Sequence, residues 1–175
     1  IGYAKAKHRN EKDGFVIQFL CIALFLFGQA DKNGIRFIEG EKWENVLKAA
    51  QEQDKYIFMD CYTSWCGPCK ALAKDIFTRK DVGDFFNANF INVKYDMEKG
   101  EGVELAKQFD VHAYPSFIII RPDGTVQHKL VGGDNLENFI ARVEKGLNEK
   151  TSLLYMNQVY QQGNMSNLEL MEYKN

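Results

Sequence analysis

Short stretches of strand-like residues recur along the chain, separated by stretches with helical spacing. Residues 56–62 are rich in aromatic and apolar side chains, and residues 90–96 alternate between apolar and polar positions. Pro122-Asp123-Gly124 has the composition of a hairpin turn between two further runs. The pattern predicts strands at 35–38, 56–62, 90–96, 116–120 and 125–131.

Between the strands, apolar residues return every three or four positions, which is typical of amphipathic helices. Asp81 is expected to cap one of these helices, and Asp134 or Asn135 another. Helices are predicted at 41–53, from 68 to about 77, from 81 to about 86, at 104–109 and from 136 to 147. Strands that alternate with helices and end in a hairpin indicate an α/β fold with a mixed central sheet flanked by helices.

The first thirty residues differ from the rest. Four basic residues precede an apolar run over 15–27, and Gly28-Gln29-Ala30 places small residues at the two positions that a signal peptidase reads. This order predicts a secretory signal peptide at 1–30. The apolar run is shorter than the roughly 20 residues that cross a bilayer, which argues against a permanent anchor. An uncleaved anchor, a lipid anchor at Cys21 and a buried first helix are the alternatives.

The end of the chain also has its own pattern. We assign 31–149 to the main domain and 150–175 to a helical extension. In that extension Leu153, Met156 and Tyr160 share a helical stripe, and Gly163-Asn164 interrupts it. We expect a helical hairpin that the end of the sequence cuts short. A solvated tail is the alternative.

Composition narrows the possible functions. Of the 175 residues, 45% are hydrophobic and 26% charged, which is typical of a soluble domain with a substantial core. The formal net charge of −2 is not gathered into basic stripes with interleaved aromatic residues, so nucleic acid is not an expected partner. Four cysteines are too few to act as a disulfide scaffold in a chain of this length.

Two of these cysteines, Cys66 and Cys69, lie where the strand at 56–62 gives way to a helix. Pro68 suits the first turn of that helix, where its missing N–H is not needed. Cys66 would then lie at the helix N-terminus, where unpaired N–H groups favour a thiolate. A reactive dithiol is therefore expected. A structural disulfide or half of a zinc site is the alternative, although no second cysteine pair or histidine cluster supplies further ligands.

Other residues suggest supporting roles. Asp60 stands in an otherwise apolar strand, where a buried carboxyl would tend to keep its proton; it is either a general base or a surface residue at the strand end. Trp65 covers the cysteines or belongs to the core. Cys61 alternates to the other face of the strand and is expected to be inert core. His112 and His128 are expected on the surface or in loops rather than as metal ligands.

With these residues in view, the chain resembles the thioredoxin family over about 36–148. Trp-Cys-Gly-Pro-Cys-Lys occurs whole at 65–70. Asp60 matches the buried acid of that family, Lys94 the lysine beside it, and Pro115 its cis-proline. Gly132-Gly133 matches the glycine turn after the last strand. The flanking tails exceed a minimal thioredoxin, and the pattern is most similar to extracytoplasmic bacterial thioredoxin-like proteins.

The resemblance implies a thioredoxin-like fold and disulfide exchange, with the Cys66–Cys69 disulfide as the only redox group and no separate cofactor or metal. Cys66 would attack a partner disulfide and Cys69 would resolve the mixed disulfide. Asp60 would take the proton of Cys69, and Lys94 would bias that proton. Substrate would contact the residues around the cysteines and the proline, namely Trp65, Gly67, Pro68, Tyr114 and Pro115.

The Gly67-Pro68 turn lacks a charged or imidazole group that would stabilise the Cys66 thiolate further, so we expect a reductase rather than an oxidant. The expected partners are protein disulfides and an upstream dithiol that supplies electrons. We expect an exported monomer that is not inserted in the membrane once the signal is cleaved. A partner-binding module on the same scaffold and a disulfide oxidant or isomerase are the alternatives.

Overall fold

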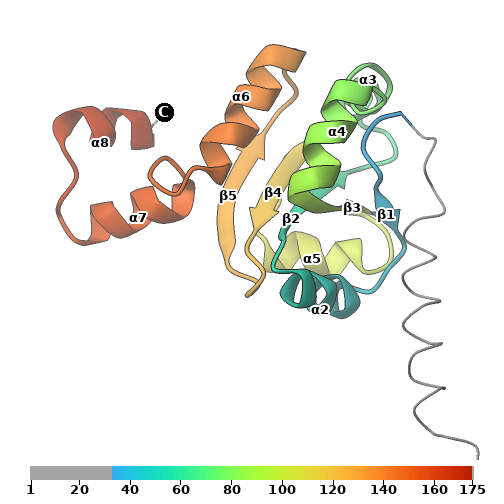
Figure 1. The fold of residues 1–175 in the computed structure, drawn as a ribbon, viewed down its shortest axis with the longest axis horizontal. Coiled ribbons are helices and arrows are strands. Elements are labelled where there is room, and N and C mark those ends of the chain that lie inside the picture. The colour runs from blue at the N-terminus through green and yellow to red at the C-terminus, as the bar shows by residue number, and fades with distance from the viewer. Residues whose placement is uncertain (1–32, 175) are drawn as a thin grey trace, which may run out of the picture. The chain divides into compact units, whose positions relative to one another are not determined.

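The centre of the fold is a five-stranded mixed sheet with strand order β1-β3-β2-β4-β5 (Figure 1). The computed structural model describes residues 33–174, so the signal peptide expected at 1–30 lies outside the described residues. Strand β2 pairs parallel to β3 and antiparallel to β4, and so stands in the middle of the sheet. The strands are β1 (Ile38–Glu39), β2 (Tyr56–Tyr62), β3 (Phe90–Asp96), β4 (Ser116–Ile120) and β5 (Val126–Val131).

Helices cover both faces of this sheet, as the periodicity predicts. Helices α2 and α5 contribute to one apolar cluster, and α3, α4 and α6 contribute to the other (Figure 1). The helices are α2 (Trp43–Gln53), α3 (Gly67–Asp75), α4 (Lys80–Asn89), α5 (Gly102–Gln108), α6 (Leu136–Leu147), α7 (Leu153–Gln161) and α8 (Asn167–Lys174). The α/β fold expected from the sequence is confirmed.

Alternation along β2 divides its side chains between the two clusters. Met59 and Cys61 lie in the cluster with α2, whereas Phe58 lies in the cluster with α3, α4 and α6. Phe58 is fully buried and stacks on Phe117 with ring centroids 5.5 Å apart. Because side chains alternate along a strand, Asp60 points to the same face as Phe58, beneath the helix that carries the cysteines.

Three local predictions fail in detail. The first strand is only Ile38–Glu39, because the Ile35 N–H bonds to the Phe77 carbonyl and the Arg36 N–H to the side chain of Asn87, outside the sheet. Asp81 does not cap α4; it lies in the first turn and pairs with Arg79. Helix α5 begins at Gly102, earlier than expected.

The C-terminal extension is helical and packs against β5. The Leu153 N–H donates to Nδ1 of His128 at 3.0 Å, and Ser152 caps α7. His128, predicted on the surface or in a loop rather than as a metal ligand, lies on β5 and is half-buried, because α6 and α7 contact it. The compact unit that begins at Asn33 includes α7 and α8. None of the helices in the described part of the chain is long and apolar enough to cross a membrane.

Candidate active site

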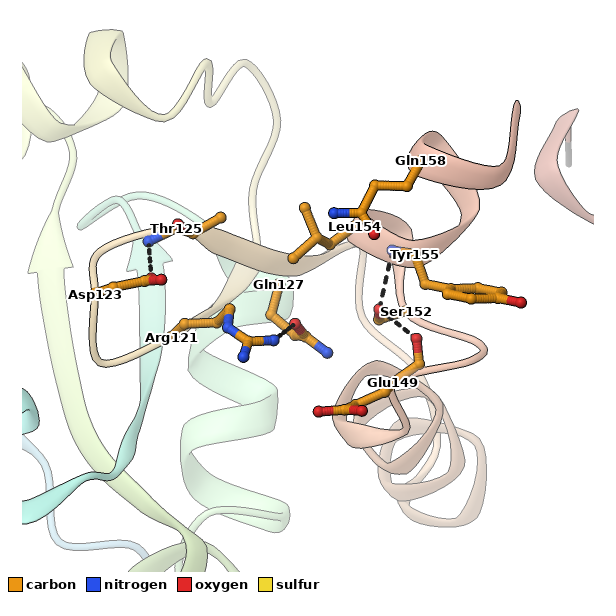
Figure 2. Close-up of a pocket in the computed structure, with 9 residues that line it drawn as sticks. All are labelled: Arg121, Asp123, Thr125, Gln127, Glu149, Ser152, Leu154, Tyr155 and Gln158. Carbon is orange, nitrogen blue, oxygen red and sulfur yellow. Dashed lines mark hydrogen bonds between the residues drawn. The ribbon is translucent and has the colours of Figure 1, made fainter. Parts of the chain in front are cut away.

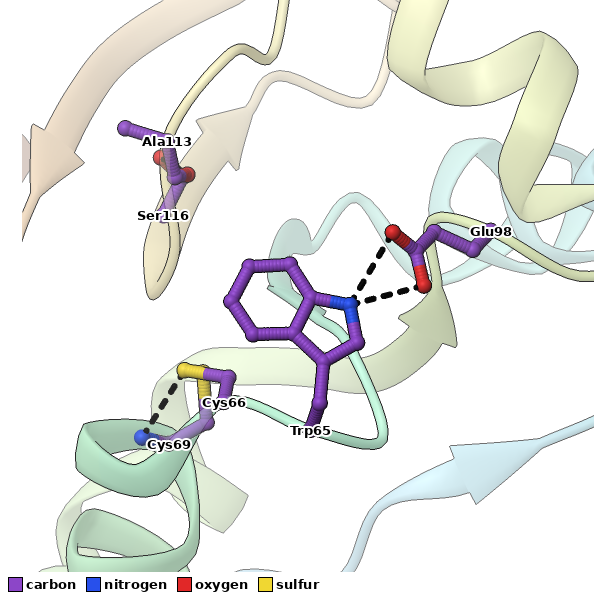
Figure 3. Close-up of a disulfide and its surroundings, with 6 residues drawn as sticks. All are labelled: Trp65, Cys66, Cys69, Glu98, Ala113 and Ser116. Atoms are coloured by element: carbon purple, nitrogen blue, oxygen red, sulfur yellow. Dashed lines mark hydrogen bonds between the residues drawn. A yellow bond between two sulfur atoms is a disulfide. The ribbon is translucent and has the colours of Figure 1, made fainter.

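The chain passes from β2 through a short turn into α3, and the two cysteines lie at this junction. Cys66 is the N-cap of α3, and Pro68 occupies the first turn, as expected. A disulfide joins Cys66 to Cys69, with Cα atoms 5.3 Å apart. The Cys69 N–H donates to Sγ of Cys66 at 3.1 Å (Figure 3). In the reduced protein the same N–H would stabilise a thiolate at Cys66. The position of Cys66 at the positive end of the helix favours the thiolate further.

Trp65 stands beside the disulfide as an exposed wall. Its side chain is 65% exposed, so the interpretation of Trp65 as a core residue is wrong. Its Nε1–H donates to both carboxylate oxygens of Glu98, at 3.0 and 2.9 Å (Figure 3). Its indole meets the Tyr114 ring edge-on, with centroids 6.1 Å apart. Contacts from both sides fix the indole next to the cysteines.

The segment before β4 lies on the other side of Trp65. The Tyr114–Pro115 peptide bond is cis, as the resemblance implies. The Pro115 carbonyl accepts the N–H of Gly132, and Ser116 Oγ donates to the Ala113 carbonyl, so backbone contacts hold this segment at the start of the strand. The tryptophan, the disulfide and the proline segment therefore come together where the central strand β2 ends and β4 begins (Figure 3).

Asp60 is a buried carboxyl below this surface. It is 6% exposed, so its interpretation as a surface residue is wrong. Within the described chain its side chain has no hydrogen bond or ion pair. Burial raises the pKa of Asp60 to about 7, and the positive charge of Lys94 opposes that rise. A carboxyl with a pKa near neutrality can both accept and release a proton.

Lys94 stands opposite Asp60 in the parallel register of β2 and β3. Its ammonium group pairs with Glu39 on the edge strand, with Nζ and Oε1 2.9 Å apart. It also lies 5.9 Å from the centroid of the Phe37 ring and 6.0 Å from that of Tyr62. These contacts keep the charge of Lys94 close enough to affect Asp60 without an ion pair between the two.

Sequence reasoning missed Glu39 and Glu98. Both are exposed glutamates in a chain with many others, and neither belongs to a motif. Their importance comes from the neighbours that the fold brings to them: Lys94 from β3 and Trp65 from the turn before α3. Only the strand register could have suggested the ion pair between Glu39 and Lys94, because the two residues are register partners in β1 and β3.

Gly67 and Pro68 separate the two cysteines at the start of α3. A Cβ on Gly67 would meet nothing within 4 Å, so this side of the turn is open to a partner. Among residues 33–174, no group of three or more His, Cys, Asp and Glu side chains is placed to hold a metal ion. Cys61 is fully buried, and burial raises the pKa of its thiol well above the ordinary value, which makes it unreactive.

Comparison with known proteins places this geometry in a family. A thioredoxin-like family model matches residues 39–122. Thioredoxin H4 of Arabidopsis thaliana is 38% identical over 103 residues, which cover 59% of this chain and 81% of that protein.

Solved structures of other proteins have the same fold. The solution structure of a candidate disulphide isomerase from Bacteroides thetaiotaomicron has 45% sequence identity and a TM-score of 0.61, and the match covers 68% of this chain and 98% of that one. A thioredoxin from Thermus thermophilus, at 18% identity and a TM-score of 0.56, shares the fold over 64% of this chain and 86% of its own.

The fold and the cysteine pair together define a thiol–disulfide oxidoreductase. The chain belongs to the thioredoxin family.

Proposed function

We propose that this chain is a protein-disulfide reductase of an exported compartment. The observation that carries the proposal is the Cys69 N–H directed at Sγ of Cys66 at the start of α3. It favours Cys66 as the attacking thiolate, whereas the exposed fractions of Cys66 and Cys69, 2% and 8%, do not separate the two. The Gly67-Pro68 turn adds no charge or imidazole that would stabilise the thiolate further, which favours reduction over oxidation of partners.

The reaction proceeds in two exchanges. The Cys66 thiolate attacks one sulfur of the partner disulfide; a Cys66–partner S–S bond forms, the partner S–S bond breaks, and the departing thiolate takes up a proton. Cys69 then loses its proton and attacks Sγ of Cys66. The Cys66–Cys69 disulfide forms, the Cys66–partner S–S bond breaks, and the partner leaves with both sulfurs reduced. The two electrons come from the dithiol, which an upstream dithiol donor must restore.

Asp60 is the proposed acceptor for the Cys69 proton. It lies on the face of the sheet that α3 covers, and its pKa of about 7 suits proton transfer near neutral pH. Lys94 favours the ionised form of Asp60 and so limits how far burial raises its pKa. This pair does not contact substrate; it acts on the proton of the resolving cysteine.

Substrate binds across the exposed surface around the disulfide. Trp65 offers an indole wall, Gly67 and Pro68 an open turn, and Tyr114 and Pro115 a backbone edge that an extended segment of the partner can pair with. Partners of this kind are proteins with an accessible disulfide. We further propose that residues 1–30 direct export, that the chain acts as a monomer, and that it uses no resident cofactor beyond its disulfide.

A disulfide isomerase is the second candidate, because the Bacteroides thetaiotaomicron protein of 45% identity is described as a candidate for that activity. The equilibrium of the Cys66–Cys69 pair with glutathione and with dithiothreitol, combined with turnover on a model protein disulfide, separates the two. A strongly reducing potential with turnover supports the reductase. An oxidising potential with reshuffling of scrambled disulfides supports the isomerase, and no turnover leaves a partner-binding module.

Trapping of mixed disulfides tests the roles of the two sulfurs. Cys69→Ala removes the resolving sulfur and should accumulate partner proteins disulfide-bonded to Cys66, because the mixed disulfide can no longer be displaced. Cys66→Ala is the matched control and should trap few. Equal trapping by both variants would show that the attacking sulfur is assigned wrongly.

A further inference from the structure

A polar cavity lies at the end of the sheet away from the disulfide. It has a volume of about 410 Å³ and is bounded by the β4–β5 hairpin and by the start of the C-terminal extension (Figure 2). The hairpin is at the end of β4 opposite Pro115, so the cavity is separate from the proposed substrate surface. Its size lies within the range of small-ligand sites.

Gln127 is the buried polar group of this cavity. Its side chain is 1% exposed, and Nε2 has no hydrogen-bond partner in the described part of the chain. A buried N–H left without an acceptor is destabilising, so such groups call for an explanation.

The orientation of the Gln127 amide follows from its neighbour. Nη1 of Arg121 donates to Oε1 of Gln127 at 3.2 Å. Exchanging the two ends of the amide would set an N–H group against the guanidinium, so Oε1 belongs on the Arg121 side. Nε2 then points away from Arg121, into the space between β5 and α7 (Figure 2).

The backbone of β5 explains why Gln127 reaches this cavity. Ile119 pairs with His128 and Ile120 with Val126, which leaves Gln127 as an extra residue without a register partner. An extra residue of this kind is a β-bulge, and bulges redirect side chains that regular alternation would place elsewhere.

Arg121 supplies charge beside the amide. Within residues 33–174 its side chain forms no ion pair, and it donates a hydrogen bond to Gln127. The nearby Asp123 carboxylate instead accepts the N–H of Thr125 at 2.8 Å. The guanidinium, which has no ion pair, and the unpartnered amide N–H both line the cavity, and each can donate to an oxygen of a carboxylate.

We propose that this cavity is a carboxylate-binding site, with one ligand oxygen on Arg121 and the other on Nε2 of Gln127. The exposed carboxylate of Glu149 lies on the opposite wall, so a ligand that carries a cationic group next to its carboxylate complements both walls. The C-terminus of a lysine-ended peptide carries both groups, whereas a free small carboxylate carries only the group that Arg121 and Gln127 would bind.

Titration of the full chain, observed by NMR at the Gln127 side-chain amide, tests the site. The probes are acetyl-Gly-Gly-Lys with a free carboxylate, the same peptide as its C-terminal amide, and acetate. The peptide acid should shift the Gln127 resonances and saturate, with the peptide amide at least about tenfold weaker. Acetate that saturates as tightly as the peptide acid identifies a small carboxylate as the ligand source.

Arg121→Gln should weaken binding of the saturating probe by about tenfold or more, because it removes the charge and keeps a polar side chain. Arg79→Gln is the matched control, because Arg79 is an exposed arginine at the N-cap of α4. This variant should bind the probe as tightly as the parent protein does. No saturation by any probe at millimolar concentration, or undiminished binding by a folded Arg121→Gln variant, shows that the cavity holds only water and overturns the proposal. Should that variant fail to fold, the comparison of peptide acid and amide still decides.

Discussion

Asp60 and Lys94 face each other across β2 and β3, yet the ammonium group of Lys94 pairs with Glu39 rather than with the aspartate. The positive charge of Lys94 therefore acts on the buried carboxyl of Asp60 through space, without a hydrogen bond between the two groups. Burial dominates, and the pKa of Asp60 rises to about 7. The proposed proton acceptor thus depends on a third residue at the edge of the sheet.

Asp60→Asn should remove a pH-dependent loss of stability. The pKa of Asp60 is about 7 in the folded protein and about 3.8 in the unfolded chain, so the unfolded chain loses the proton first as pH rises. Stability then falls between about pH 4 and pH 7, by up to about 4 kcal/mol at 1.36 kcal/mol per unit. Urea unfolding across this range should show the fall in the parent and not in the variant. An equal fall in both would place the effect elsewhere.

Glu39→Gln should lower the pKa of Asp60. Without the carboxylate, the charge of Lys94 is no longer neutralised, and its side chain is free to move toward Asp60. The midpoint of the pH dependence of turnover should move down by a few tenths of a unit, a change of roughly 0.5 kcal/mol. Glu52→Gln, which breaks the exposed pair with Lys48 on α2, is the control and should leave the midpoint unchanged.

Glu98→Ala should slow reduction of protein disulfides by about two- to fivefold. The indole of Trp65 loses both of its hydrogen-bond acceptors and is held less firmly beside the cysteines. The activation free energy should rise by about 1 kcal/mol or less. Glu98→Gln, which keeps one acceptor, should restore part of the rate. Reaction with dithiothreitol, which is too small to need the wall, should change little. Glu104→Ala on α5 is the control. A loss that is equal for both substrates would argue against a positioning role for Trp65.

The four longer strands, the cysteine turn and the face on which Asp60 lies were predictable, because each depends on residues close together in sequence or on alternation within one strand. The partners of Trp65 and Lys94 were not, because exposed glutamates carry no periodic signal. The bulge that turns Gln127 into its cavity was also invisible, since it depends on a register change between β4 and β5. Local patterns thus predicted the chemistry, whereas long-range pairing determined how it is held in place.

His128 gives the last prediction, which concerns the extension. Nδ1 of His128 accepts the N–H of Leu153 and can do so only while it is unprotonated. Burial, and then the charges of Lys145 and Arg142, lower the pKa of His128 to about 4. The unfolded chain, with a pKa near 6.5, takes up the proton first as pH falls, so stability is lost between about pH 6.5 and pH 4.

The side chain is only partly buried, so this loss is discounted to about 2 kcal/mol. His128→Asn should abolish it, whereas His112→Asn, at an exposed histidine paired with Asp110, should not. Hydrogen exchange at the Leu153 amide, corrected for the intrinsic rate, provides the local measurement. In the parent protein, protection of this amide should decrease as the pH is lowered, before the sheet itself opens. Protection that stays constant down to pH 4 would show that α7 is held on β5 by its apolar contacts, such as those of the buried Met156, and not by this hydrogen bond.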